Sequence, residues 1–106
     1  MSEFTIKRDT KLCHVTLADD LTAVQIPALR TALKAELDGG VREVIFDMNQ
    51  TVMLDSSGIG LLIATFNTLN RQQGRLRVVN ASPDIVQLLQ TMRLVNRLNV
   101  TGRANN

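Results

Sequence analysis

The stretch VMLDSSGIG, residues 52–60, decides how this chain folds. Its apolar start predicts the end of a strand, and the apolar residues that follow it predict a helix, with a short turn between them. A side-chain oxygen can cap a helix by accepting a backbone N–H, so either Asp55 or Ser56 is the expected N-cap. The sequence leaves that choice open.

Two glycines stand in the first turn of this helix, where alanine is more stable by up to ~1 kcal/mol. A local preference broken in this way is typical of a functional site. Because Gly58 and Gly60 have no side chains, we expect the hydroxyls of Ser56 and Ser57 to be open to another protein.

Before the motif, residues 4–6 and 13–17 alternate between apolar and polar side chains, which predicts two half-buried strands. The short polar connection at residues 8–11 predicts an antiparallel hairpin. A helix should follow from about Val24, capped by Thr22 and holding Pro27 in its first turn. Gly39 and Gly40 should end this helix.

Val44, Ile45 and Phe46 are apolar without alternation, which predicts a central strand covered on both faces. The helix of the motif should then run from residue 56 or 57 to about residue 73, where Gly74 stops it.

The next predicted strand covers residues 76–79, and Ser82 with Pro83 begins a third helix. A last short strand is expected within residues 94–101. The third helix should bury one apolar stripe, made of Ile85, Leu88, Leu89 and Met92.

Strands that alternate with helices predict parallel pairing through right-handed crossovers. Together with the N-terminal hairpin, this gives an α/β fold with a mixed, mostly parallel sheet. Ligand sites in such folds commonly lie at the carboxyl ends of the strands. The turn at residues 55–57 should lie at this edge of the sheet.

The chain has 106 residues, so we expect a single domain over residues 1–106 with an ordered core from about 4 to 100. Aromatic residues make up only 3%, which predicts an aliphatic core. The lone Cys13 cannot form an internal disulfide and is expected to be a small buried hydrophobe. No signal peptide and no apolar stretch long enough for a membrane is evident, so we expect a cytoplasmic protein without membrane insertion.

The net charge of +2 is unevenly distributed, with −2 in residues 1–52 and +4 in residues 53–106. Nucleic-acid binding is not expected, because the arginines are scattered and no aromatic residues are interleaved to stack on bases. A solvated face or an acidic protein partner remains as the interpretation of this excess charge.

The residues needed for an enzyme are missing. His14 is the only histidine and Cys13 the only cysteine, so no metal cluster is expected. The glycines at 58 and 60 begin a dinucleotide fingerprint, but Ile63 stands where its third glycine belongs. We therefore expect no catalytic residues, no cofactor and no bound metal.

The segment Asp55-Ser56-Ser57-Gly58-Ile59-Gly60 resembles the signature of the STAS domain, specifically that of bacterial anti-sigma factor antagonists. The order of elements fits this family from about residue 4 to residue 100. The resemblance implies that Ser56 is phosphorylated by a partner kinase. It also implies partner contacts in the motif and in the loop after the second strand, at Asp55, Ser56, Ser57, Gly58, Ile59, Asp19, Asp20 and Leu21.

The implied function is partner switching. The unphosphorylated chain would bind an anti-sigma factor that is also a serine kinase, phosphorylation of Ser56 would end that binding, and a serine phosphatase would restore it. Thr22 departs from the family pattern, which usually has an acid after the leucine, and this weakens the transfer of contacts to the loop. Two alternatives are an accessory subunit docked on a transporter ATPase, with Ser56 only a cap, and a nucleotide-binding module.

Overall fold

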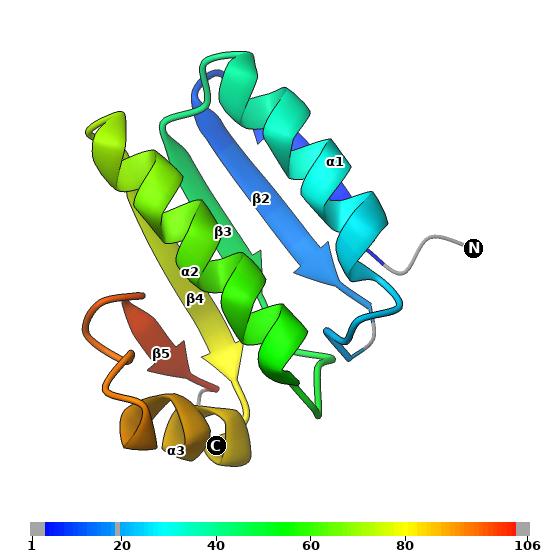
Figure 1. The fold of residues 1–106 in the computed structure, drawn as a ribbon, viewed down its shortest axis with the longest axis vertical. Coiled ribbons are helices and arrows are strands. Elements are labelled where there is room, and N and C mark those ends of the chain that lie inside the picture. The colour runs from blue at the N-terminus through cyan, green and yellow to red at the C-terminus, as the bar shows by residue number, and fades with distance from the viewer. Residues whose placement is uncertain (1–3, 19, 104–106) are drawn as a thin grey trace.

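The computed structural model describes residues 4–18 and 20–103, which form one five-stranded sheet and three helices (Figure 1). The strand order is sequential, β1-β2-β3-β4-β5. β1 is antiparallel to β2 and every other pair is parallel, which confirms the predicted hairpin and the mostly parallel sheet. In chain order the elements are β1 (Phe4–Asp9), β2 (Leu12–Leu17), α1 (Ile26–Asp38), β3 (Glu43–Asp47), α2 (Ser56–Arg71), β4 (Arg75–Ala81), α3 (Pro83–Thr91) and β5 (Val100–Gly102).

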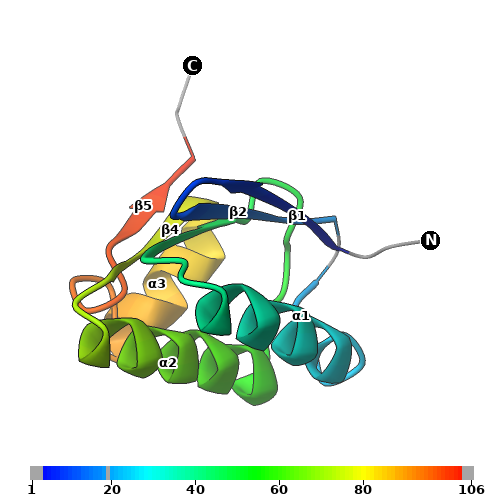
Figure 2. The same ribbon diagram turned by 90° about the horizontal axis from the view of Figure 1, so that it is seen from above.

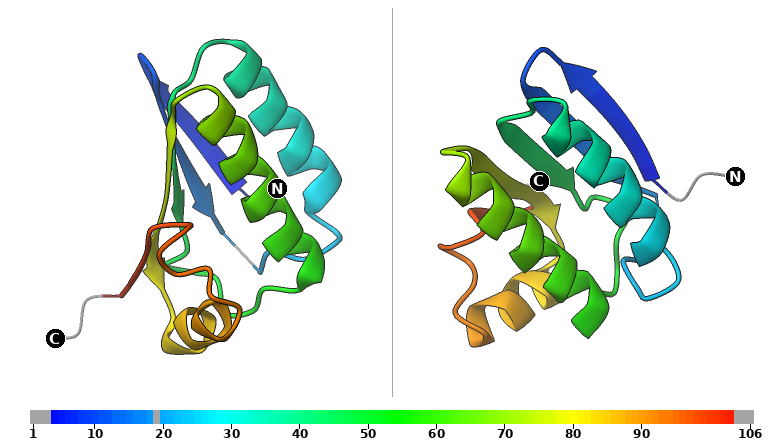
Figure 3. Two further views of the ribbon diagram at one scale, coloured as in Figure 1. Left: turned by 60° about the vertical axis from the view of Figure 1, so that its left-hand side comes forward. Right: turned by 45° about the horizontal axis from the view of Figure 1, so that its top comes forward.

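The helices leave one face of the sheet open. Figure 2 shows α1 and α2 side by side beneath the sheet, and the two views in Figure 3 place α3 beyond the carboxyl end of β4. Alternation along β2 follows from this layering, because Cys13, Val15 and Leu17 are buried while the residues between them are only partly covered. The period of two therefore predicted the buried side of this strand correctly.

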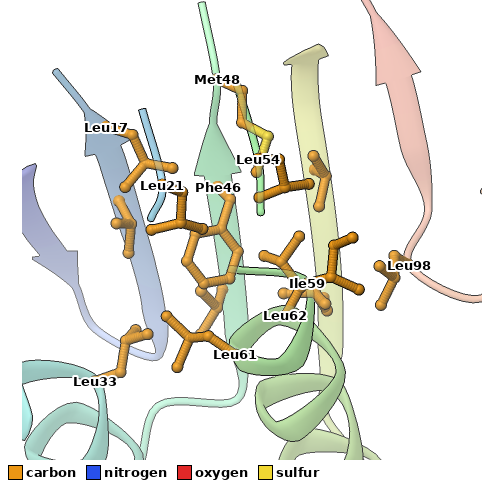
Figure 4. Packing of buried hydrophobic residues seen from close by; sticks show 14 of the residues in the cluster. Leu17, Leu21, Leu33, Phe46, Met48, Leu54, Ile59, Leu61, Leu62 and Leu98 are labelled. Carbon is orange, nitrogen blue, oxygen red and sulfur yellow. The ribbon is translucent and has the colours of Figure 1, made fainter. Parts of the chain in front are cut away.

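β3 is buried on both faces, as predicted, but the helices cover only one of them. Val44 and Phe46 are fully buried, and Figure 4 shows Leu21, Leu61 and Ile59 gathered around Phe46. Ile45 points to the face that no described helix covers, yet only 8% of it is exposed. The predicted burial of both faces is therefore confirmed, although no described helix covers the face of Ile45, whose neighbours in register are His14 and Arg77 of the adjacent strands.

The strand predicted at the start of the motif is also absent. β3 ends at Asp47, and residues 48–55 form a loop in which Leu54 makes a single parallel bridge with Leu21. The chain has to leave the sheet here to reach the helix layer. Leu54 still contributes to the core, whereas Val52 and Met53 point outward.

α1 begins about two residues later than predicted, and Thr22 does not cap it. Its N-cap is Gln25, which makes no side-chain cap bond, and Pro27 lies in the first turn as expected. Thr22 instead closes a turn before the helix, because its backbone N–H and its hydroxyl both donate to Oε1 of Gln25, at 3.0 and 2.8 Å. At the other end Gly40 adopts a φ of 99°, a conformation that glycine tolerates best.

At the end of α2, the residue that reverses the chain is not the one predicted. Gln73 takes the left-handed conformation, with a φ of 60°, and the N–H of Gly74 returns to the carbonyl of Leu69. Gly74 is required for a different reason. A Cβ there would lie 2.4 Å from the carbonyl oxygen of Arg42, so this glycine permits a close approach of two backbones.

α3 begins at Pro83 with Ser82 as its cap, as predicted, since the Ser82 hydroxyl accepts the N–H of Ile85 at 3.2 Å. Its buried stripe is narrower than expected. Ile85 and Leu89 are buried, but Leu88 and Met92 are exposed because no described element lies against their side of the helix.

Cys13 is fully buried on β2. Burial, with a smaller contribution from the charge of Glu36, raises the pKa of its thiol from 9.0 to about 11. The thiolate is the reactive form of cysteine, so this side chain is an inert part of the core. Among residues 4–18 and 20–103, no helix combines the length and the apolar character needed to cross a membrane.

Candidate functional site

The first turn of α2 is capped by Asp55, which resolves the choice between Asp55 and Ser56. Asp55 has extended backbone angles, as an N-cap residue should, and its Oδ1 accepts the N–H of Gly58 at 2.9 Å. Ser56 is therefore the first helical residue. Its side chain is exposed, and that of Ser57 is partly covered.

A pair of loops meets at this helix start. Figure 1 shows the loop between β2 and α1 beside the loop that enters α2, both at the carboxyl edge of the central strands. The backbone N–H of Leu21 donates to the carbonyl of Met53 at 3.2 Å, and the N–H of Asp55 donates to the carbonyl of Leu21 at 3.4 Å.

Two carboxylates hold the loops together, and each accepts backbone N–H groups from the loop that does not carry it. Oδ1 of Asp20, in the first loop, accepts the N–H groups of Val52 and Met53 in the second, both at 2.8 Å. Oδ2 of Asp55 accepts the N–H of Ala23 in the first loop at 3.2 Å. We call Asp20 and Asp55 the carboxylate clasp. A carboxylate that accepts backbone N–H groups makes a stronger bond than a neutral acceptor, so the clasp fixes how the loops face the solvent.

The two glycines of the motif have separate roles. A Cβ on Gly58 would lie 2.5 Å from the carbonyl oxygen of Leu21 and 2.7 Å from Cδ1 of Leu54. Gly58 therefore lets the first loop lie directly on the helix. A Cβ on Gly60 would meet nothing within 4 Å, and this residue is exposed. Only Gly60 leaves open surface beside the serines, as the sequence analysis expected of both glycines.

Three apolar side chains on the two loops that meet at the start of α2 are largely exposed. Val24 is 79% exposed, Val52 71% and Met53 59%. We call them the apolar rim. Sequence reasoning missed them, because Val24 was assigned to a helix and the other two to a strand. The available signal was that each of these three residues lies in a segment with polar residues on both sides.

The predicted contact residues divide by burial. Ser56 is exposed, while Asp20, Asp55 and Ser57 are partly exposed. Leu21, Gly58 and Ile59 are buried, so their observed contacts are internal, and they support the exposed residues from below. Asp19 lies outside the residues that the structure describes.

A serine-histidine arrangement is not assembled at this site. Nε2 of His14 lies 3.7 Å from Oδ2 of Asp47, but these side chains belong to the face of the sheet opposite α2. Within the described ranges, no three His, Cys, Asp or Glu side chains gather as a metal site would require.

The profile of the STAS domain family matches residues 3–103. The chain belongs to the STAS domain family. The anti-sigma-B factor antagonist of Staphylococcus aureus is 24% identical over 90 residues, which cover 85% of this chain and 83% of that protein. The protein of the same name from Bacillus subtilis is 24% identical over 101 residues, covering 93% and 90%. The phosphorylated form of the Bacillus cell fate determinant SpoIIAA shares the fold, with a TM-score of 0.78 at 21% identity over 96% of this chain and 92% of that one.

Removing the Asp55 carboxylate should lower the free energy of unfolding of this STAS domain more than removing a cap that makes a single hydrogen bond. Asp55→Ala deletes the bonds to both Gly58 and Ala23, whereas Ser82→Ala deletes one cap bond at α3. A lost cap typically costs about 1 kcal/mol. We expect that value for Ser82→Ala and about 2 kcal/mol for Asp55→Ala, from urea unfolding followed by circular dichroism. Equal losses would mean that the bond to Ala23 contributes nothing.

Proposed function

We propose that this STAS domain is an anti-sigma factor antagonist in a partner-switching pathway. Its unphosphorylated form binds an anti-sigma factor that is also a serine kinase, and this binding releases a sigma factor or another client. Phosphorylation of Ser56 ends the complex, and a metal-dependent serine phosphatase restores it. In this proposal the chain is a substrate and a binding partner in the cytoplasm and carries out no chemistry itself.

The observation that carries the proposal is the exposed Ser56 at the start of α2, where the two loops that carry the apolar rim meet. A kinase has to reach the hydroxyl, and a stable complex needs apolar surface that the fold itself does not use. Both conditions are met at one place. The names of the relatives from Staphylococcus aureus and Bacillus subtilis support the same role.

The domain should tolerate the phosphate. A phosphoserine carries about −1.5 to −2 charges at pH 7. At the N-terminus of a helix the dipole favours negative charge by roughly 0.3–1 kcal/mol at an exposed site. A related protein of the same fold has been solved in a phosphorylated form, which supports this expectation.

A bound partner should not tolerate the phosphate. It would bury a doubly charged group next to the carboxylate of Asp55 and within a surface that is otherwise apolar at Val24, Val52 and Met53. Burial of an uncompensated charge costs several kcal/mol, and each ~1.4 kcal/mol lowers affinity tenfold. The switch therefore needs no large change of shape.

Mass spectrometry of the protein isolated from its own cells tests the proposal. Trypsin leaves Ser56 and Ser57 on one peptide, residues 43–71, because no lysine or arginine lies between Arg42 and Arg71. We expect part of the pool to carry one phosphate, with fragment ions that separate residues 56 and 57 assigning it to Ser56. The Ser56→Ala variant expressed in the same cells should lack it.

Two other outcomes are informative. A pool that is unmodified across growth conditions would contradict the switch and favour the permanent accessory subunit of a transporter ATPase. A phosphate on Ser57 would keep the mechanism but move it to the second hydroxyl.

A further inference from the structure

Arg103, just past β5, holds the loop that carries Val52 and Met53, two of the three residues of the apolar rim. Its guanidinium donates from Nη2 to the carbonyl oxygens of Met48 and Thr51, at 3.0 and 3.1 Å. Its Nε donates to the carbonyl of Asn80 at 3.0 Å, and its backbone N–H donates to the carbonyl of Ala81 at 3.0 Å. One residue at the end of the sheet thus binds both β4 and the loop between β3 and α2.

The contact with Thr51 continues into the clasp. The carbonyl of Thr51 and the N–H of Val52 belong to the same peptide group. That group accepts from Arg103 on one side and donates to Oδ1 of Asp20 on the other, at 2.8 Å. A hydrogen-bonded chain therefore runs from a cation through a peptide to an anion. Bonds in such a chain polarise and strengthen each other.

We propose that Arg103 is a positioning residue for partner binding, which acts by orienting Val52 and Met53. It contributes no surface of its own to the rim. Without the guanidinium, the loop keeps the clasp at its far end but loses two anchors at its near end. The rim is then presented in several orientations, and a partner has to select one of them. The binding part of this inference rests on the proposed function, and the orientation of the loop does not.

The alternative role for Arg103 is stability alone, since its bonds to Asn80 and Ala81 also hold β5 to the sheet. The two roles differ in where the effect appears. Loss of stability accelerates opening of the whole domain, whereas loss of positioning accelerates opening at residues 52 and 53 only.

Amide hydrogen exchange on the full chain separates these roles without any partner. In Arg103→Gln we expect exchange at Val52 and Met53 to become at least about tenfold faster, which is the effect of losing charge-assisted hydrogen bonds. The amides of Phe46 and Ile59 should change less than about twofold. Arg103→Lys keeps the charge with fewer donors and should fall between wild type and Arg103→Gln. Arg97→Gln, at an exposed arginine of the same region, is the matched control.

Phosphorylation kinetics with the purified cognate kinase and ATP test the binding part. Arg103→Gln should raise KM for this protein about tenfold and leave kcat within about twofold, because Ser56 and its cap remain in place. Equal acceleration of all amides, or an unchanged KM beside a wild type that is phosphorylated normally, would overturn the inference. If no kinase acted on wild type, the proposed function would fail, and the exchange experiment would still decide whether Arg103 orients the loop.

Discussion

Replacing Ser56 with aspartate is expected to weaken partner binding about a hundredfold or more without destabilising the fold. Ser56→Asp places a negative charge at the exposed first position of α2, next to Asp55 and at the meeting point of the loops that carry the apolar rim. The isolated domain should be as stable as wild type, because the helix dipole favours the charge. The complex with the anti-sigma factor should lose about 2.7 kcal/mol or more, which is about a hundredfold in Kd.

Titration calorimetry with the cognate anti-sigma factor measures this effect. Ser56→Ala should bind as tightly as wild type, since it removes the hydroxyl without adding charge. Asn67→Asp adds the same charge on an exposed part of α2 about three turns further along and should also bind normally. Equal affinity for the Ser56→Asp and Ser56→Ala variants would remove the basis of the proposed switch.

The two glycines of the motif should respond to alanine in opposite directions. In Gly58→Ala the new Cβ would meet the carbonyl oxygen of Leu21 at 2.5 Å, so the loop must move off the helix. Overpacking of this kind typically costs 1–3 kcal/mol, and we expect about 2–3 kcal/mol because backbone has to shift. In Gly60→Ala the methyl meets nothing within 4 Å, so a gain of about 0.4–1 kcal/mol is expected from the reduced freedom of the unfolded chain.

Urea unfolding of the two variants gives the comparison directly, since the substitutions are chemically identical and two residues apart. Gly58→Ala should also lose affinity for the partner, because the displaced loop carries Val24. If both variants had the same stability, the close contact between Gly58 and Leu21 would not determine the position of the loop.

The regular parts of the fold could be predicted because each has a local cause. The period-two pattern of residues 13–17 gave the inward face of β2, and Ser82-Pro83 gave the start of α3. The parallel pairing of the strands followed from their alternation with helices, and the helix start at the motif followed from its polar residues.

Most of the errors arose where contacts distant in sequence decide the conformation. Val52 and Met53 have the composition of a strand, but Asp20 takes their N–H groups and leaves both side chains in solvent. Thr22 is a local exception. Threonine commonly caps helices, but the hydroxyl of Thr22 bonds to Gln25, three residues further on, in a turn before the helix. The role of Arg103 could not be predicted either, because its partners lie 23 to 55 positions away in the sequence.

The apolar rim has a consequence for cells that run several such pathways at once. Val24, Val52 and Met53 point away from the core, so their identity is not constrained by packing. The backbone that presents them is held by Asp20, Asp55 and Arg103, mainly through bonds to main-chain groups whose chemistry is independent of those side chains. Under the proposed function, duplicated copies of this domain can therefore change these three residues and keep the fold, Ser56 and its cap. Substitutions at the surface are then enough to prevent a domain of one pathway from binding the partner of another.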